Sequence, residues 1–288
     1  DETFLLSAGG EPDVAYWSFT DSHPSEPFPS YVEPTGDPPD PFRDDFATDY
    51  DLTALDSYDF QDASGTVWTN DVFGAGTGVI SPFARLQATG NADMQDGVNT
   101  SGDLNNDEKA QANGFTRDLL LSEVALFDQT NSDVLDGSDG DGGYGDGKFY
   151  EFRFDINENS NSNGEQYLSL DELMIFVSTE NNLTIESTDV YGKTAEEIAA
   201  LFYDSDLGSS AEAAGLEAGQ LQLVYDLDAF DDTWVALNYD LQAGSGVGDI
   251  ALYVEQQDFL AAMANLVDPD GLWDGTTQTT YVYLVSST

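Results

Sequence analysis

Oxygen-bearing side chains recur at alternate positions around one loop, with the spacing by which a chain wraps a hard cation. Asp155, Asn157 and Glu158 follow an apolar run and enter a stretch rich in Asn, Ser and Gly. Asp171 and Glu172 stand where that stretch returns to a second apolar run. Carboxylate and amide oxygens are the ligands that Ca²⁺ prefers, so the sequence predicts a calcium site at this loop. The alternative is an Asn-rich turn whose acidic side chains face water.

A second candidate calcium site lies at Asp103, Asn105 and Asp107, which have the spacing of the first three ligands of an EF-hand loop. The sixth position is Glu108 instead of Gly, and the twelfth is Gly114 instead of Glu, so an EF-hand is excluded. We expect a looser and weaker calcium loop here, and a solvated acidic turn is the alternative.

Two further acidic stretches are interpreted without a metal. The run at 136–146 is rich in Gly and occurs once, whereas calcium-binding solenoids need several repeats, so it indicates an acidic surface loop. The segment at 268–274 contains Pro and Gly between its acidic residues, and its composition favours a turn over an ion site.

The whole chain is strongly acidic. It has 56 Asp and Glu residues against 7 Lys and Arg, which gives a formal net charge of -49. This charge excludes nucleic acid as an electrostatic partner and argues against binding to anionic membranes. No apolar run reaches the ~20 residues of a membrane span, so we expect no membrane insertion. Self-repulsion destabilises the compact state unless salt or metal screens it, and calcium would provide that screening.

Several classes of chemistry are excluded by what the sequence lacks. The chain has no cysteine, so disulfides, thiol catalysis and cysteine-ligated zinc are ruled out. The one histidine, His23, lies among prolines and is a poor candidate for a catalytic triad. Carboxylate pairs for glycoside hydrolysis are so numerous that no single pair is informative. We therefore expect a protein that is not an enzyme.

The pattern from residue 46 to 288 predicts an all-β fold with a minor helical part. Many short runs alternate apolar and polar residues and are separated by Gly, Asp, Asn and Ser, which is typical of an antiparallel β-sandwich. Two short helices are expected to connect strands, one opened by the capping box Thr194–Glu197 and continuing through Ile198–Phe202, and one at Gln257–Asn265. The predicted strands are Thr66–Trp68, Phe83–Leu86, Leu119–Leu121, Lys148–Phe154, Leu173–Val177, Leu221–Tyr225, Thr233–Tyr239, Ile250–Val254 and Thr280–Val285.

Residues 1–45 differ from this pattern and predict an extended N-terminal arm. Two strand-like runs, Thr3–Ser7 and Val14–Phe19, precede a segment with seven prolines between Pro24 and Pro41. Such a segment favours a semi-rigid polyproline-like linker. The apolar runs could add to an exposed sheet edge of a neighbouring copy through main-chain hydrogen bonds. The side chains that would fill pockets there are Phe4, Leu6, Tyr16 and Trp17. The alternative is that the arm packs on its own domain as an edge strand.

Several segments together resemble a group of secreted bacterial proteins, many of which carry a sorting tail of the PEP-CTERM type. The resemblance implies an extracellular, non-enzymatic protein of the exopolysaccharide or surface layer. This sequence departs from the pattern of that group in two ways. The usual sorting tail is not found in it, and the Pro-rich arm is an addition. The segments that carry the resemblance are 76–87, 97–100, Phe149–Glu158, Leu168–Leu173, 224–228, 244–249 and 281–284.

These observations predict a structural subunit of an extracellular filament or matrix. It would contain a calcium-stabilised β-sandwich at 46–288 and assemble head-to-tail with other copies through the arm at 1–45. Asp1 would be the processed end of a secreted protein after removal of a signal peptide. A secreted carbohydrate-binding or adhesive module, with extracellular polysaccharide as its partner, is the alternative. A polysaccharide hydrolase or lyase is the least favoured interpretation.

Overall fold

The structure is a computed structural model, and it describes the elements and connections that follow. They cover residues 2–7, 16–19, 59–61, 66–69, 96–100, 117–128, 147–154, 167–185, 190, 192–204, 216, 219–229, 233–238, 250–268, 271 and 273–287. This part of the chain is rich in antiparallel strands and poor in helix, which confirms the predicted mostly-β class.

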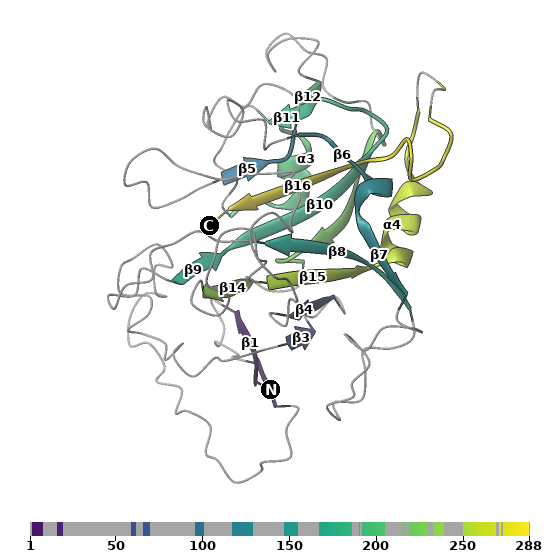
Figure 1. The fold of residues 1–288 in the computed structure, drawn as a ribbon. Helices are drawn as coiled ribbons and strands as arrows, with labels where there is room; N and C mark the ends of the chain where they lie inside the picture. Colours follow the sequence, from purple (N-terminus) through teal and green to yellow (C-terminus); the bar gives the residue numbers. More distant parts are fainter. Residues whose placement is uncertain are drawn as a thin grey trace. The chain divides into compact units, whose positions relative to one another are not determined.

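The chain divides into two compact units, each assembled from three separate stretches of sequence. The first unit comprises Asp1–Ile80, Leu126–Leu170 and Asp228–Glu255. The second comprises Ser81–Ala125, Asp171–Leu227 and Gln256–Thr288. Figure 1 shows the elements of both, and each unit is considered by itself below.

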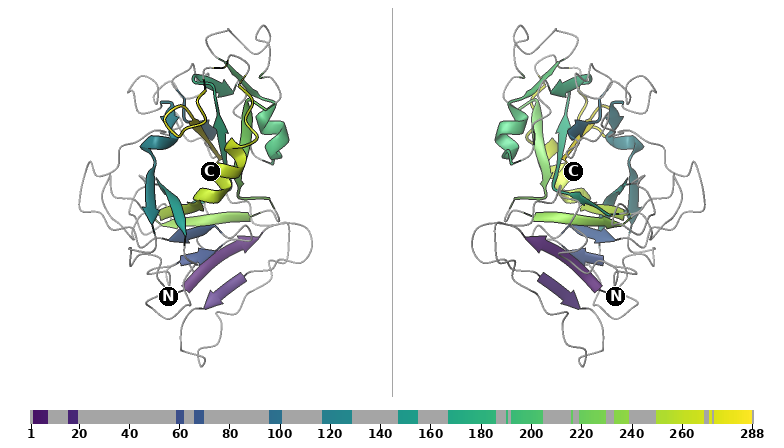
Figure 2. Two further views of the ribbon diagram at one scale, coloured as in Figure 1. Left: turned by 90° about the vertical axis from the view of Figure 1, so that its right-hand side faces the viewer. Right: turned by 90° about the vertical axis from the view of Figure 1, so that its left-hand side faces the viewer.

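The first unit contains two antiparallel sheets. In one sheet the strand order is β2-β1-β14-β9, and in the other it is β3-β4-β15-β8-β7. The pair β1 and β2, drawn in purple, lies side by side in both views of Figure 2. The strands are β1 (Glu2–Ser7), β2 (Tyr16–Phe19), β3 (Asp59–Gln61), β4 (Val67–Thr69), β7 (Ala125–Asp128), β8 (Lys148–Phe154), β9 (Tyr167–Leu170), β14 (Thr233–Asn238) and β15 (Ile250–Glu255).

The second unit contains one larger sheet and a small two-stranded one. The larger sheet has the order β13-β10-β16-β5, and β6 also pairs with β16. The small sheet is the antiparallel pair β11 and β12. The strands are β5 (Asp96–Val98), β6 (Leu119–Leu120), β10 (Glu172–Ser178), β11 (Leu183–Ile185), β12 (Phe202–Asp204), β13 (Leu221–Asp226) and β16 (Tyr281–Ser287), and the 3-10 helix η2 (Leu121–Glu123) follows β6.

Two short α-helices belong to the second unit. The first, α3 (Ala195–Ala199), opens with the predicted capping box: the Thr194 hydroxyl accepts from the Glu197 amide, and the Glu197 carboxylate accepts from the Thr194 amide. The second, α4 (Gln256–Met263), buries Phe259 and packs against β13 and β10. Both predicted helices are therefore confirmed.

The core of the second unit lies between its larger sheet and the layer made by β11, β12 and α3. Alternate residues of β10 and β16 point to this layer, because successive strand residues face opposite sides of a sheet. Burying these side chains supplies most of the driving force for folding this unit. The cluster contains Val98, Met174, Phe176, Leu183, Ile185, Val190, Ile198, Phe202, Tyr283 and Val285.

Candidate functional sites

Asp171 and Glu172, which the sequence proposes as calcium ligands, lie at the start of β10 and are both buried. Each residue is only 5% exposed. The Asp171 amide donates to the Ser287 carbonyl at 2.9 Å, and Oε1 of Glu172 accepts the Gly192 amide at 2.7 Å. A buried carboxylate requires hydrogen bonds or an opposite charge to offset its lost hydration. The bond from the Gly192 amide is one such bond, and it joins the turn before α3 to β10.

The Ser287 hydroxyl lies close to these carboxylates in the sheet register. Ser287 on β16 is the cross-strand partner of Glu172 on β10, and cross-strand partners share one face of an antiparallel sheet. Its Oγ is buried and makes no hydrogen bond, which is unusual among the side chains that the structure describes. A buried hydroxyl oxygen without a hydrogen bond is therefore present opposite the buried Glu172.

The remaining predicted ligands lie outside the described residues. They are Asp155, Asn157 and Glu158 of the first loop, and Asp103, Asn105 and Asp107 of the second. Within the described ranges no group of three or more His, Cys, Asp or Glu side chains is arranged to hold a metal ion. The predicted calcium ligands thus stay a prediction, with Asp171 and Glu172 as the two whose surroundings are known.

The predicted assembly residues are placed by the strand register of the first unit. Phe4 and Leu6 lie on β1, and Tyr16 and Trp17 lie on β2. Four residue pairs join β1 to β2, including Phe4 with Trp17 and Leu5 with Tyr16. The two apolar runs of the N-terminal segment therefore form an antiparallel pair with one another.

The strand β1 also pairs with β14 of the same chain. Leu6 is opposite Trp234 and Ser7 is opposite Thr233. On its other side β14 pairs with β9 through four residue pairs, from Val235 opposite Leu170 onward. In this structure β14 therefore pairs with β1 of its own chain.

A partly buried ion pair on β8, which also binds a tyrosine of β15, was not anticipated from the sequence. The Glu151 carboxylate accepts from Nε and, at 3.2 Å, from a terminal nitrogen of Arg153. The Tyr253 hydroxyl donates to the same carboxylate at 2.6 Å. Hydrogen bonding to Glu151 raises the pKa of Arg153 above its usual value. These three hydrogen bonds meet at the Glu151 carboxylate, and the one from Tyr253 joins β8 to β15.

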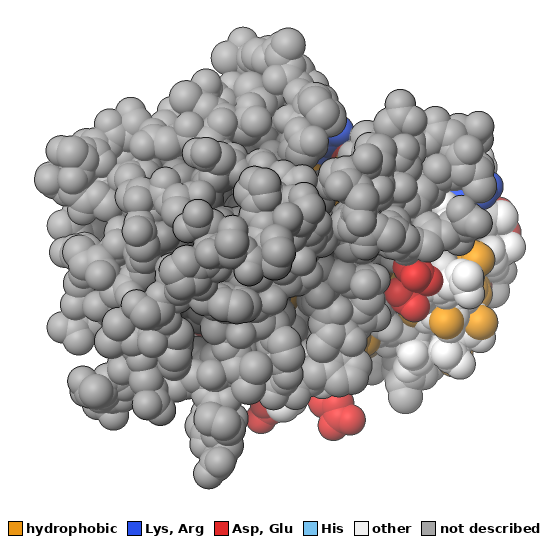
Figure 3. Space-filling view, turned by 90° about the horizontal axis from the view of Figure 1, so that it is seen from below, with side chains coloured by type: hydrophobic (Ala, Val, Ile, Leu, Met, Phe, Trp, Pro, Cys, Tyr) orange, Lys and Arg blue, Asp and Glu red, His pale blue; other side chains and the backbone are white. Residues whose placement is uncertain are grey.

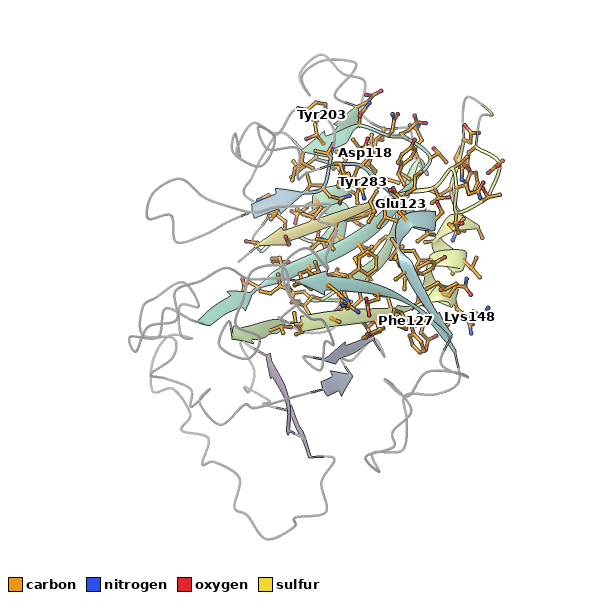
Figure 4. The ribbon with its side chains drawn as sticks, viewed as in Figure 1. Asp118, Glu123, Phe127, Lys148, Tyr203 and Tyr283 are labelled. Atoms are coloured by element: carbon orange, nitrogen blue, oxygen red, sulfur yellow. The ribbon has the colours of Figure 1, made fainter. Side chains whose placement is uncertain are left out.

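A second polar cluster surrounds the buried Tyr283 hydroxyl in the second unit. This hydroxyl accepts the Leu183 amide at 3.1 Å and donates to the Glu180 carbonyl at 3.0 Å. Asp118 lies beside it at 3.5 Å and also accepts the Asn182 amide (Figure 4). Burial, and next the negative charge of Asp118, raise the pKa of Tyr283 well above its ordinary value. The cluster holds the turn between β10 and β11 against β16.

In the acidic segment at 268–274, the two described carboxylates, those of Asp268 and Asp274, accept hydrogen bonds from nearby groups. Asp268 accepts the amides of Gly271 and Trp273. Asp274 accepts the Thr276 amide and the hydroxyls of Thr276 and Thr279. The hydrogen bonds from the Thr279 and Thr276 hydroxyls lower the pKa of Asp274.

Exposed hydrophobic side chains on the described surface are few. Acidic and hydrophobic side chains lie beside one another at the right of the face drawn in Figure 3. The large hydrophobic residues with substantial exposure are Leu126, Leu223, Leu260 and Val267, which come from different segments. Single exposed hydrophobic residues are ordinary in soluble proteins and mark no binding surface. None of the described helices has the length and apolar character needed to cross a membrane.

Comparison of the chain with family models, with curated proteins and with solved structures found no match.

Proposed function

We propose that this protein is a structural subunit of an extracellular filament or matrix. A β-sandwich body at 46–288 would assemble head-to-tail with other copies through the N-terminal arm at 1–45. The observation that supports this most is the pairing of β1 with β14, since it identifies β1 as a strand that completes a sheet of the body. Strand addition of this kind gives affinity through main-chain hydrogen bonds.

Calcium is the second part of the proposal. A net charge of -49 opposes both folding and the close approach of copies, because every copy carries the same excess of carboxylates. Calcium bound at Asp171, Glu172 and the acidic residues of the preceding loop would reduce that repulsion. The buried Ser287 hydroxyl, which is opposite Glu172 in the sheet register, would provide one more oxygen ligand for Ca²⁺.

The proposed function is tested by the size and shape of the native protein in calcium and in chelator. Light scattering and negative-stain electron microscopy should show polymers in calcium, with shorter or fewer polymers after EDTA at constant ionic strength. Soluble monomers under every condition would overturn the filament proposal. Monomers that bind polysaccharide would favour the carbohydrate-binding module instead.

A further inference from the structure

We propose that the antiparallel pair β1 and β2 is exchanged between copies as one unit, and that the edge of β14 in the next copy accepts it. This inference rests on the proposed function and adds the acceptor strand, its register and the exchanged segment. The partner is a second copy of this chain.

The register shows that β1 is joined more extensively to β2 than to β14. Four residue pairs link β1 and β2, from Glu2 with Phe19 to Leu5 with Tyr16. Only two residue pairs link β1 and β14. Removing the N-terminal pair from its own body therefore breaks the shorter of the two ladders and preserves the longer one. The unit that moves is a hairpin-like pair, and a single extended strand would lose more hydrogen bonds.

The acceptor strand β14 belongs to the body and is held there by β9. Four residue pairs fix β14 to β9, so the position of β14 does not depend on β1. If β1 leaves, β14 presents unpaired N–H and C=O groups at the edge of its sheet, and such an edge recruits another strand. A neighbouring copy offers the same β1 sequence and can restore the same two residue pairs.

The sequence after β2 makes the exchange geometrically feasible. Seven prolines lie in the 18 residues from Pro24 to Pro41. A polyproline segment extends about 3.1 Å per residue, so 18 residues would span roughly 56 Å. Residues 20–58, which join β2 to β3, number 39, so the whole tether is longer than this segment. The linker can therefore reach a neighbouring body.

Exchange of this kind propagates because the donor and acceptor surfaces differ. Each copy gives its β1 and β2 pair to the next copy and receives another pair on its β14. A head-to-tail contact that does not close on itself generates an open filament. In the assembled form the pairs between β1 and β14 join two copies, whereas the pairs between β1 and β2 stay within one copy. The assembled form and the closed monomer therefore differ mainly at the linker.

Cysteine cross-linking tests the exchange directly, because the natural chain has no cysteine. One protein carries Ser7→Cys and another carries Thr233→Cys, the two positions being register partners. Cross-strand partners have Cα atoms about 4.5–5.5 Å apart, which suits a disulfide. The two variants are mixed in the dissociated state, assembled and oxidised, and the covalent products are identified by mass. A second pair, Leu6→Cys with Trp234→Cys, guards against poor folding of the first.

The expected yield of covalent heterodimer is at least about tenfold above that of a control in which Ser7→Cys is mixed with Asn238→Cys, since docking raises the effective concentration of the first pair alone. Asn238 lies on β14 opposite Tyr167, five positions beyond Thr233, which is roughly 17 Å along a strand. The double variant Ser7→Cys/Thr233→Cys, purified as a monomer, should form its disulfide within one chain. Filaments in which only that intrachain disulfide forms would overturn the exchange and leave the filament proposal standing. A protein that never assembles would overturn the filament proposal and this inference with it.

Discussion

The side chain of Asn99 completes the sheet of the second unit at a point where two strands leave a gap. β5 pairs with β16 at Val285 and beyond, whereas β6 pairs with β16 at Tyr281 and Val282. Between them, the Asn99 amide nitrogen donates to the Val282 carbonyl at 2.8 Å, and its Oδ1 accepts the Leu284 amide. One side-chain amide thus replaces a missing segment of backbone.

We predict that Asn99→Ala lowers the free energy of unfolding by about 2–3 kcal/mol, because it leaves a buried N–H and a buried C=O without partners. Urea unfolding followed by circular dichroism measures this loss. The matched control is Asn265→Ala, since Asn265 is exposed and donates only to the Ala261 carbonyl. The control should lose under about 0.5 kcal/mol. Equal losses in both variants would show that Asn99 does not bridge the strands.

The buried Tyr283 gives stability a dependence on alkaline pH. Its folded pKa is raised above the unfolded value of about 10, so its contribution is complete below pH ~10 and declines as the pH rises further. We predict that Tyr283→Phe lowers stability at pH 8 and flattens the decline above about pH 10. Thermal unfolding at pH values on both sides of 10 provides the measurement, and Tyr281→Phe, at a tyrosine whose pKa is raised less strongly, should flatten the decline less. A decline as steep in Tyr283→Phe as in the natural chain would refute this role.

Only some of these residue contacts can be predicted from the sequence. The alternation in β8 places Glu151 and Arg153 on one face two positions apart, so their ion pair was visible in principle. Asn99 gives no such signal, because its partner Val282 is 183 positions away along the chain. Glu172 is similar: its burial depends on the layer that folds over it, and its type and neighbours alone suggest an exposed ligand.

At the scale of elements, strands with strong apolar alternation were predicted well. Lys148–Phe154 forms β8 with the predicted bounds, and β10, β13, β15 and β16 differ from prediction by one or two residues at their ends. The short strands β3, β5, β7, β9, β11 and β12 were missed, because three or four residues carry too little periodicity. The predicted strand Phe83–Leu86 lies outside the described residues. Two residues belong to another element than predicted: Leu121 begins η2 instead of continuing β6, and Phe202 begins β12 instead of ending α3.

The junction of β13 with the segment after α4 depends on a glycine. Gly219 has φ of +97°, its carbonyl accepts the Val267 amide, and an added Cβ would lie 2.6 Å from the Val267 side chain. We predict that Gly219→Ala lowers the free energy of unfolding by about 2–3 kcal/mol, because alanine is strained at a positive φ and because its Cβ overpacks against Val267. Gly271→Ala should cost only about 1 kcal/mol, since Gly271 has φ of +68° with open space around it.

The double variant Gly219→Ala/Val267→Ala should lose about as little free energy of unfolding as Gly271→Ala, because the second substitution removes the methyl group that clashes with the added Cβ. Chemical denaturation of the three variants measures these energies. If Gly219→Ala were no more destabilising than Gly271→Ala, the close approach to Val267 would not matter for stability.

At the scale of the whole molecule, the net charge of -49 destabilises the folded chain by self-repulsion, and bound cations would reduce that repulsion. A cation that binds only the folded chain stabilises it by mass action, by about 2.7 kcal/mol at 100 times its dissociation constant. We predict that EDTA at constant ionic strength lowers the melting temperature, and that Asp155→Ala removes most of this effect. Glu196→Ala, at an exposed acidic residue of α3, should retain it. An identical melting curve with and without EDTA would contradict the calcium proposal.

Assembly through the N-terminal strands is tested most directly by sedimentation velocity, with the full chain compared with a protein that lacks residues 1–20. We predict that the full chain sediments as polymers, whereas the truncated protein sediments as a folded monomer with an intact β-sheet circular dichroism spectrum. A synthetic peptide of residues 1–20 should bind the truncated protein at a ratio of about one to one, because it restores the β1 pairing on β14. If the truncated protein assembles like the full chain, assembly through the N-terminal strands is wrong.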